Sequence, residues 1–229
     1  LLHIYNKVDS LPYIKKSFVG SGIRYDLMNE IYGRELITKH VSGRLKVAPE
    51  HTSDSVLKIM RKPSWEQYER FHRFFEQVNT EAGLRQQLIP YFISSHPGCT
   101  NQDMQQLAER CRQLHYRPEQ VQDFTPTPMT LATEMYHTGL DPYTLKPIFV
   151  ARTKDDKLAQ RQFFFWYKPE ERRTIKQFLQ KIKRPDIADR LFLGEKEDKF
   201  PNSQFPILNS NRHYEQERKQ FFDKKRRKK

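Results

Sequence analysis

Short apolar runs alternate with helical patterns along residues 1–147, which is typical of β–α units. Apolar runs cover residues 17–22, 44–48 and 87–95, and residues 121–128 form a fourth strand candidate. Apolar residues at helical spacing follow the first three runs. Strands that alternate with helices predict an α/β fold with a parallel sheet covered on both faces, as in an open sheet, a barrel or a half-barrel.

The helices between these strands can be placed by their apolar stripes and end signals. Ile23, Leu27 and Ile31 predict a helix over residues 23–33. Further helices are predicted over residues 53–62, which Pro63 ends, over residues 65–83, which Gly83 ends, and after a capping box formed by Thr100 and Asp103. The last helix would bury Met104, Leu107, Ala108, Cys111 and Leu114.

The character of the sequence changes after Pro147. Residues 148–199 predict a small helical extension with two helices broken at Pro169. In residues 200–229, Pro, Asn and Ser accumulate and the apolar spacing is lost, so this tail is predicted to be basic and largely disordered.

Charge is concentrated in that tail. The 229-residue chain carries a net charge of +13, and residues 212–229 hold nine Lys or Arg against three Asp or Glu. Such a tail is either a solubilising segment or a weak, salt-sensitive RNA contact. With 36% hydrophobic residues and no run near the ~18 apolar residues of a membrane span, the protein is expected to be cytoplasmic and to have no membrane contact.

The cysteines exclude several classes of site. Cys99 and Cys111 are the only two, too few for a disulfide scaffold, a four-thiolate zinc site or the ligands of an iron–sulfur cluster. The sequence also contains no Walker loop, no G-x-G-x-x-G and no G-x-S-x-G, so nothing favours a P-loop enzyme or a serine hydrolase.

Polar side chains gather where the predicted strands end. In parallel α/β folds this edge of the sheet binds ligands. The candidate residues follow the four strands in order: Ser21 and Arg24; Glu50 and His51; Ser94, Ser95 and His96; Thr125 and Thr127. A metal-dependent hydrolase built on Glu50, His51 and His96, with Cys99 as a further zinc ligand, is a weaker alternative because the spacing is not that of a zinc motif.

Lys46 is unusual because it lies within a strand that should be buried. A buried ammonium is costly unless it is paired, and Glu50 or a bound carboxylate or phosphate could pair it. Alternatively, Lys46 lies on an exposed strand face and extends into water.

Four stretches together resemble the second half of the YgiQ-like radical-SAM proteins. In chain order they are "VGSGIRYDLM", "GRLKVAPEHTSDSVLKIMRKPS", "PYFISSHPGCT" and "VQDFTPTPMTLATEMYHTGLDPY". The resemblance implies a partial (β/α)6 TIM-like barrel, in which a [4Fe-4S] cluster and S-adenosylmethionine generate a 5'-deoxyadenosyl radical. The C-x-x-x-C-x-x-C motif that binds the cluster is absent from this sequence. The chain therefore looks like the C-terminal half of the barrel plus the start of the family's extension.

The resemblance also implies roles for the matching residues. It would place Ser21 and Arg24 against S-adenosylmethionine and Glu50 near its ribose or methionine end, with His51 as a further cofactor-binding residue. His96 and Gly98 would follow the adenine through backbone contacts, Thr125 and Thr127 would close the adenine side, and Lys46 would meet a cofactor carboxylate or an acidic substrate. The implied partners are the N-terminal remainder of the parent enzyme, which would hold the cluster ligands upstream of this chain, and an unknown substrate. Without those ligands this segment is expected to be inactive by itself.

Overall fold

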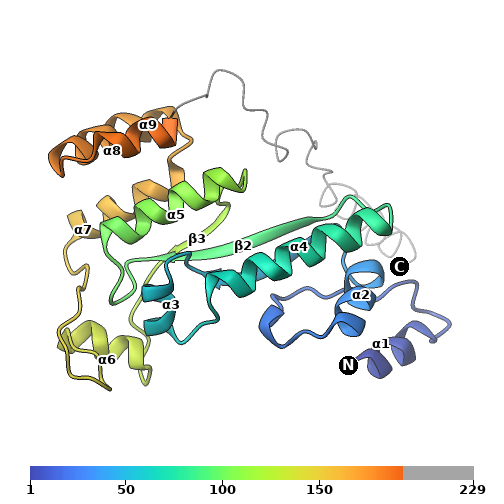
Figure 1. Cartoon of the computed structure of the whole chain (residues 1–229). Coiled ribbons are helices and arrows are strands. Elements are labelled where there is room, and N and C mark those ends of the chain that lie inside the picture. Colours follow the sequence, from blue (N-terminus) through green and yellow to red (C-terminus); the bar gives the residue numbers. More distant parts are fainter. Residues whose placement is uncertain (193–229) are drawn as a thin grey trace, which may run out of the picture. The chain divides into compact units, whose positions relative to one another are not determined.

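The computed structural model describes residues 1–192, which belong to one compact unit of the chain (Figure 1). The elements before the extension are α1 (Leu2–Asp9), η1 (Tyr25–Leu27), α2 (Glu30–Lys39), β1 (Arg44–Glu50), α3 (Asp54–Met60), α4 (Trp65–Glu81), β2 (Gln87–Ser94), α5 (Asn101–Gln113), β3 (Gln120–Asp123) and α6 (Leu131–Thr138). The extension contains α7 (Lys154–Arg161), η2 (Gln162–Phe165), α8 (Pro169–Lys181) and α9 (Pro185–Phe192).

Three of the four predicted strands form a parallel sheet in the order β1-β2-β3. This confirms the mixed α/β class, while the barrel stays a prediction. Val47 pairs with Pro90 at the last regular position before a register shift towards Glu50, so the proline lies beside an irregularity as its missing N–H requires.

The strand predicted over residues 17–22 does not form. Ile23 alone makes an isolated parallel bridge with Val47, and the Val19 N–H bonds to the carbonyl of His40 instead of to a strand. Gly20 and Gly22 explain the difference, because glycine lacks a side chain to pack and weakens a strand.

The helix predicted over residues 23–33 is also wrong in its position. The chain forms a short 3-10 turn and begins α2 only after Asn29, whose Oδ1 accepts the Tyr32 N–H at 2.8 Å as an N-cap. As a result Ile31 is 75% exposed, and the buried positions of α2 are Gly33, Leu36 and Ile37.

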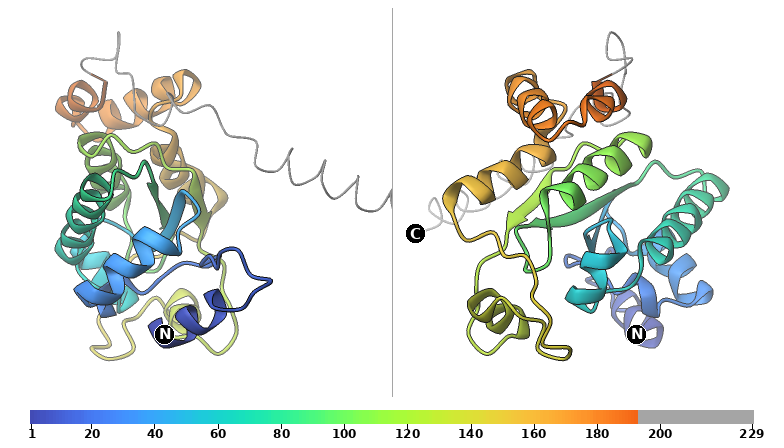
Figure 2. Two further views of the ribbon diagram at one scale, coloured as in Figure 1. Left: turned by 90° about the vertical axis from the view of Figure 1, so that its right-hand side faces the viewer. Right: turned by 60° about the vertical axis from the view of Figure 1, so that its left-hand side comes forward.

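Helices α3, α4 and α5 lie in front of the sheet in Figure 1, and Figure 2 shows this layering from two further sides. The helices over residues 53–62 and 65–83 and the helix after Thr100 are confirmed, and both hydrogen bonds of the predicted capping box are present. The core contains Leu45, Val47, Val56, Leu57, Tyr68, Phe71, Phe75, Phe92, Met104, Leu107 and Cys111.

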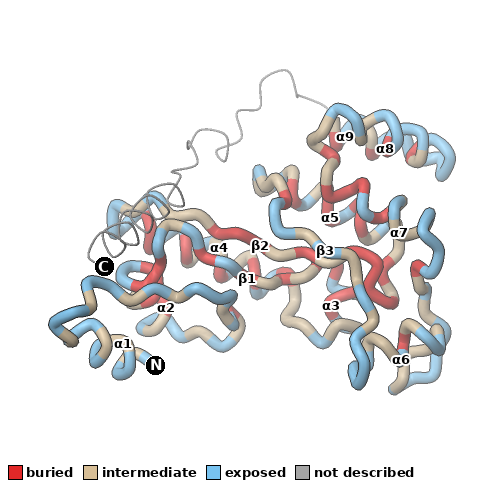
Figure 3. Tube along the Cα trace, turned by 180° about the vertical axis from the view of Figure 1, so that it is seen from behind, coloured by how far each residue is buried: buried red, intermediate tan, exposed pale blue. Residues whose placement is uncertain are grey.

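The opposite face of the sheet is exposed at its two edge strands within the described part of the chain, whereas Ile89 of the central strand β2 is buried. Arg44 and Lys46 of β1 and Gln120 and Gln122 of β3 are exposed, and the strands lie towards the viewer in Figure 3. Lys46 is thus solvent-accessible in this structure, which matches the second of the two readings of that residue.

The extension packs its apolar run onto α5. Phe163, Phe164 and Trp166 are completely buried, and η2 contacts α5, α7 and α8. The predicted break at Pro169 is confirmed, since this proline occupies the first turn of α8, where its missing N–H costs nothing. The domain boundaries 1–147, 148–199 and 200–229 stay predictions, and residues 193–229 lie outside the described part.

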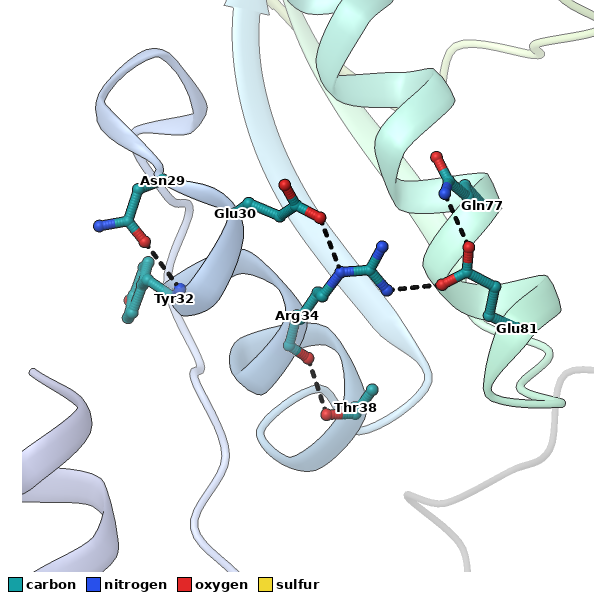
Figure 4. A network of polar contacts seen from close by, with 7 residues as sticks. All are labelled: Asn29, Glu30, Tyr32, Arg34, Thr38, Gln77 and Glu81. Atoms are coloured by element: carbon teal, nitrogen blue, oxygen red, sulfur yellow. Dashed lines mark hydrogen bonds and ion pairs between the residues drawn. The ribbon is translucent and has the colours of Figure 1, made fainter.

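A polar network on the surface connects α2 with α4 (Figure 4). Arg34 bonds Glu30 within α2 at 3.0 Å and Glu81 of α4 at 2.5 Å. Exposed ion pairs of this kind contribute little, at most about 1 kcal/mol each. The attachment of α2 therefore depends mainly on the burial of Leu36 and Ile37.

No helix in residues 1–192 combines the length and the apolar character needed to cross a membrane.

Substitutions in α2 distinguish its observed register from the one predicted by the sequence. We expect Leu36→Ala to lower the free energy of unfolding by about 2–5 kcal/mol, because it leaves a cavity in the core. Ile31→Ala, at an exposed position of the same helix, should change it by less than about 0.5 kcal/mol. Urea unfolding measures both, and a larger loss for Ile31→Ala would contradict the observed register.

Candidate functional site

Parallel pairing brings the carboxyl ends of β1, β2 and β3 to one edge of the sheet. We call this edge the strand-end rim and define it as residues 50–53, 94–99 and 123–127. Its two later parts are joined directly, because the Ser94 hydroxyl donates to Asp123 Oδ1 at 2.5 Å and the Phe124 N–H donates to the Ser94 carbonyl.

Glu50 ends β1 in a left-handed backbone conformation, with φ of 69°. Its Oε1 pairs with Lys62 Nζ at 3.0 Å, whereas Oε2 is buried and has no hydrogen-bond partner in the described residues. Glu50 thus neutralises Lys62, and the pairing with Lys46 considered from the sequence is not present in this structure.

Arg24 lies beside the rim, one residue after the bridge between Ile23 and Val47. Its exposed guanidinium binds Asp26 through two hydrogen bonds of 2.8 and 2.6 Å, which hold the pKa of that carboxyl below its ordinary value. Burial, with the nearby charges of Asp26 and Glu50, raises the pKa of Tyr25 to about 12. The Tyr25 hydroxyl is therefore protonated at neutral pH, and it has no hydrogen-bond partner among the described residues.

A buried polar junction connects the loops that follow β1 and β2. Asp103 accepts hydrogen bonds from Ser53 at 2.7 Å and from Thr100 at 2.6 Å. Burial opposes ionisation of Asp103, but these hydrogen bonds outweigh it and lower the pKa of the carboxyl. The junction therefore holds an ionised carboxylate between the two loops.

His51 is completely buried in the same junction. Its Nδ1 accepts the Ser53 N–H at 2.9 Å, so the proton of the neutral ring is on Nε2, which faces Cys99 Sγ at 3.6 Å. Burial lowers the pKa of His51 to about 4 and raises the pKa of the Cys99 thiol. A neutral thiol with no exposed surface is not a nucleophile.

His96 is buried on the other side of the turn after β2. Its Nδ1 donates to the Pro97 carbonyl at 2.8 Å, and burial lowers its pKa. Its ring packs against the Phe124 ring in a T-shaped arrangement, with 5.2 Å between the ring centroids. Gly98 has φ of 86°, and its N–H donates to the Phe149 carbonyl at 2.8 Å.

The remaining predicted residues are exposed. Ser21 precedes the Ile23 bridge, and Thr125 and Thr127 follow β3 in a turn in which each hydroxyl bonds a carbonyl two residues earlier. Two cavities, of about 530 and 380 Å³, lie elsewhere: the first between α7, η2 and α8, and the second between residues 25–30 and α4. Arg24, Glu50 and His96 line neither of them.

The sequence reasoning missed two polar residues near the predicted ones, Tyr25 beside the rim and Thr52 within it. Like Glu50 Oε2, the hydroxyls of Tyr25, Thr52 and the predicted Ser95 are buried without a hydrogen-bond partner in the described residues. Ser95 also has a left-handed φ of 61°. Tyr25 and Thr52 directly follow the predicted Arg24 and His51, so a wider window around each strand end would have found them.

The zinc alternative gains no support from the described residues. No group of three or more His, Cys, Asp or Glu side chains comes together there to hold a metal ion. The basic segment 212–229 of the nucleic-acid alternative lies outside the described residues, and its RNA contact stays a prediction.

Comparison with known proteins shows which proteins this chain is similar to. A family model described as a domain of unknown function (DUF3362) matches residues 119–218. UPF0313 proteins of Bacteroides thetaiotaomicron and Porphyromonas gingivalis are 60% and 54% identical over 84% of this chain, and one of Clostridium perfringens is 45% identical over 81%.

The chain belongs to the UPF0313 family, which confirms the resemblance to YgiQ-like proteins. It spans about a third of the length of these relatives: 33%, 32% and 29%, respectively.

The buried His51 should make stability depend on pH. Because its pKa is about 4 in the folded protein and about 6.5 in the unfolded chain, only the unfolded chain binds a proton between these values. Stability should therefore fall by about 2 kcal/mol as the pH decreases from 7.5 to 5. His51→Asn keeps an acceptor near Nδ1 and should lose this contribution, while the other histidines titrate alike in both proteins. Equal pH dependence in urea unfolding would refute the assignment.

Gly98 is required by both its backbone angle and its surroundings. A Cβ at this position would lie 2.3 Å from Ile59 Cδ1, so Gly98→Ala should destabilise the protein by about 2–4 kcal/mol. Gly83, with φ of 64° and open space around it, is the matched control. Gly83→Ala should cost only the backbone term of about 1–2 kcal/mol. Thermal unfolding of both variants gives the comparison, and equal losses would show that contact with Ile59 is unimportant.

Proposed function

We propose that this chain forms part of the (β/α)6 barrel of a radical-SAM iron–sulfur enzyme and that its strand-end rim binds S-adenosylmethionine. The observation that carries the proposal is the Glu50 carboxylate, which ends β1 with one buried oxygen that has no partner in the described residues. Membership of the UPF0313 family and the order of the motifs support the same assignment.

Unpartnered polar atoms at the rim are of the kind that a ligand would satisfy. Leaving a buried acceptor or hydroxyl without a hydrogen bond costs about 1–3 kcal/mol. Glu50 and Ser95 combine this cost with left-handed backbone angles, and such strain is often found at ligand sites. S-adenosylmethionine offers the matching groups, since its ribose hydroxyls and its ammonium group donate hydrogen bonds that a carboxylate can accept.

The open face of the sheet supports the barrel. Parallel sheets are normally covered on both faces by apolar packing, whereas Arg44, Lys46 and Gln122 make this face polar on both sides of the apolar central strand. In the proposed barrel this face lines the interior, and Lys46 contacts the carboxylate of the cofactor or of an acidic substrate. The exposed position of Lys46 leaves its ammonium group available for that contact.

The iron–sulfur cluster does not fit the residues of this chain. Cys99 and Cys111 are both buried, and burial raises the pKa of each thiol, whereas cluster ligands are thiolates. We therefore assign the cluster ligands to the part of the family's proteins that this chain does not span. In radical-SAM enzymes, S-adenosylmethionine supplies the 5'-deoxyadenosyl radical that removes a hydrogen atom from the substrate.

The residues of this chain would bind and orient the cofactor. Glu50 accepts hydrogen bonds from it through Oε2, while Oε1 stays paired with Lys62. Neutral His51 and the Asp103 carboxylate hold the loops after β1 and β2 in place.

Binding of S-adenosylmethionine to the full-length protein that carries this segment tests the proposal. We expect Glu50→Gln to weaken binding by about ten- to a hundredfold, because a hydrogen bond to a charged acceptor is lost. Arg24→Ala should weaken it as well, by releasing Asp26 and residues 24–26 next to Glu50.

Glu30→Gln is the control, since Glu30 forms an exposed ion pair with Arg34 away from the rim. Isothermal titration calorimetry gives the dissociation constants, and circular dichroism checks that each variant is folded. Unchanged affinity in both the Glu50 and the Arg24 variants would remove these residues from the site.

A further inference from the structure

The C-terminal extension contributes a buried polar side chain to the strand-end rim. Helix α7 packs against α5 and β2, and Gln160 near its end is completely buried. Glutamine is rarely buried to this extent, because both ends of its amide then need hydrogen-bond partners within the protein.

Both partners of Gln160 belong to the turn that follows β2, residues 95–99. Gln160 Oε1 accepts the Ser95 N–H at 2.7 Å, and its Nε2 donates to the Cys99 carbonyl at 2.7 Å. A backbone N–H can only donate and a carbonyl can only accept, so the amide has a single orientation here. One side chain of the extension therefore fixes both ends of this turn.

The turn needs a restraint from outside because its backbone is strained. The strain lies at Ser95, which has φ of 61°, since Gly98 adopts its φ of 86° without a steric cost. A left-handed conformation at a residue other than glycine costs about 1–2 kcal/mol and persists only when its surroundings enforce it. A second restraint comes from Phe149, whose carbonyl accepts the Gly98 N–H at 2.8 Å.

A neighbouring residue of α7 extends the same connection to β3. Arg161 Nη1 bonds Asp123 Oδ2 at 2.7 Å, and the other oxygen of Asp123 accepts the Ser94 hydroxyl. Arg161 thus attaches the extension to the Asp123 carboxylate, which joins the carboxyl ends of β2 and β3. Arg161 is partly exposed, so this contact is weaker than the two buried bonds of Gln160.

Gln162 is a second buried glutamine of the extension, but within the described residues it makes no hydrogen bond to the turn after β2. Its Nε2 donates at 2.9 Å to the carbonyl of Ala159 in the preceding helix α7, within the extension. The two glutamines are two residues apart and differ in whether they reach the rim.

We propose that the extension is a positioning element for the rim and that Gln160 is its principal positioning residue. Gln160 and Phe149 lie within the region matched by the domain of unknown function, residues 119–218, and they hold the Ser95–Cys99 turn in the conformation that meets the ligand. The identity of that ligand, S-adenosylmethionine, rests on the function proposed above, whereas the restraint on the turn does not.

Amide hydrogen exchange of this chain tests the restraint. Gln160→Met keeps nearly the same volume and removes both hydrogen bonds, and Gln162→Met is the matched control. We expect exchange in a peptide covering residues 94–99 to become about tenfold faster or more in Gln160→Met and to change less than about twofold in the control. Equal exchange in the two variants would overturn the proposal.

If Gln160→Met does not fold, hydrogen exchange of a less disruptive variant, Arg161→Met, tests the same proposal. Arg161→Met removes only the partly exposed bond to Asp123 and should accelerate exchange at Ser94 and Phe124 by about threefold. No acceleration there would contradict the proposed role of α7.

Titration of the full-length protein with S-adenosylmethionine tests the consequence for binding. At a temperature where all variants are folded, Gln160→Met should bind about tenfold more weakly, whereas Gln162→Met should bind like the unmodified protein. Unchanged binding in Gln160→Met would overturn the positioning role. If the unmodified protein does not bind S-adenosylmethionine at all, the proposed function fails, while the exchange measurement still decides whether Gln160 restrains the turn.

Discussion

The parallel pairing of β1 with β2 and of β2 with β3 is the constraint on which the rest of the structure depends. Parallel strands need a crossover, and here α3 with α4, and then α5, provide the two crossovers on the same face of the sheet. Each crossover begins at the carboxyl end of a strand, so the loops after β1 and β2 are forced next to each other. The polar residues of these loops meet for this reason.

The junction of His51, Ser53, Thr100 and Asp103 makes this proximity stable. The Asp103 carboxylate caps α5 through Thr100 and also accepts a hydrogen bond from Ser53 of the other loop. His51 uses Nδ1 for the Ser53 N–H and Nε2 for Cys99. These side chains hold the two loops in place. Glu50 Oε2 and the Ser95 hydroxyl take no part in the junction and have no hydrogen-bond partner in the described residues, so they are the groups that a ligand could bind.

Sequence reasoning succeeded where a single local signal was strong. The long apolar stripe of α4 and the capping box of α5 predicted those helices correctly, and Glu50 and His96 lie at the ends of β1 and β2 as expected, while their cofactor contacts stay predictions. It failed at residues 17–33, because two glycines and the Asn29 cap outweighed the spacing of Ile23, Leu27 and Ile31. It could not find Lys62 or Gln160 as partners of the rim. Gln160 meets Ser95 from 65 positions away, and nothing in the local pattern around it indicates that contact.

One face of the sheet is only partly covered by the described residues, since its two edge strands are exposed there. The edge strand β1 alternates exposed or half-buried with buried residues, whereas Leu88, Ile89 and Pro90 of the central strand β2 are all buried, as is usual for a central parallel strand. An open polar face is unfavourable for a finished parallel sheet, but it suits the interior of a barrel that holds a charged ligand. The relatives are about three times as long as the aligned segment, so they have enough chain to cover that face. Lys46 is exposed on this face of the sheet. In the proposed barrel the same face lines the interior, so its ammonium group would be available to an anionic group of the ligand.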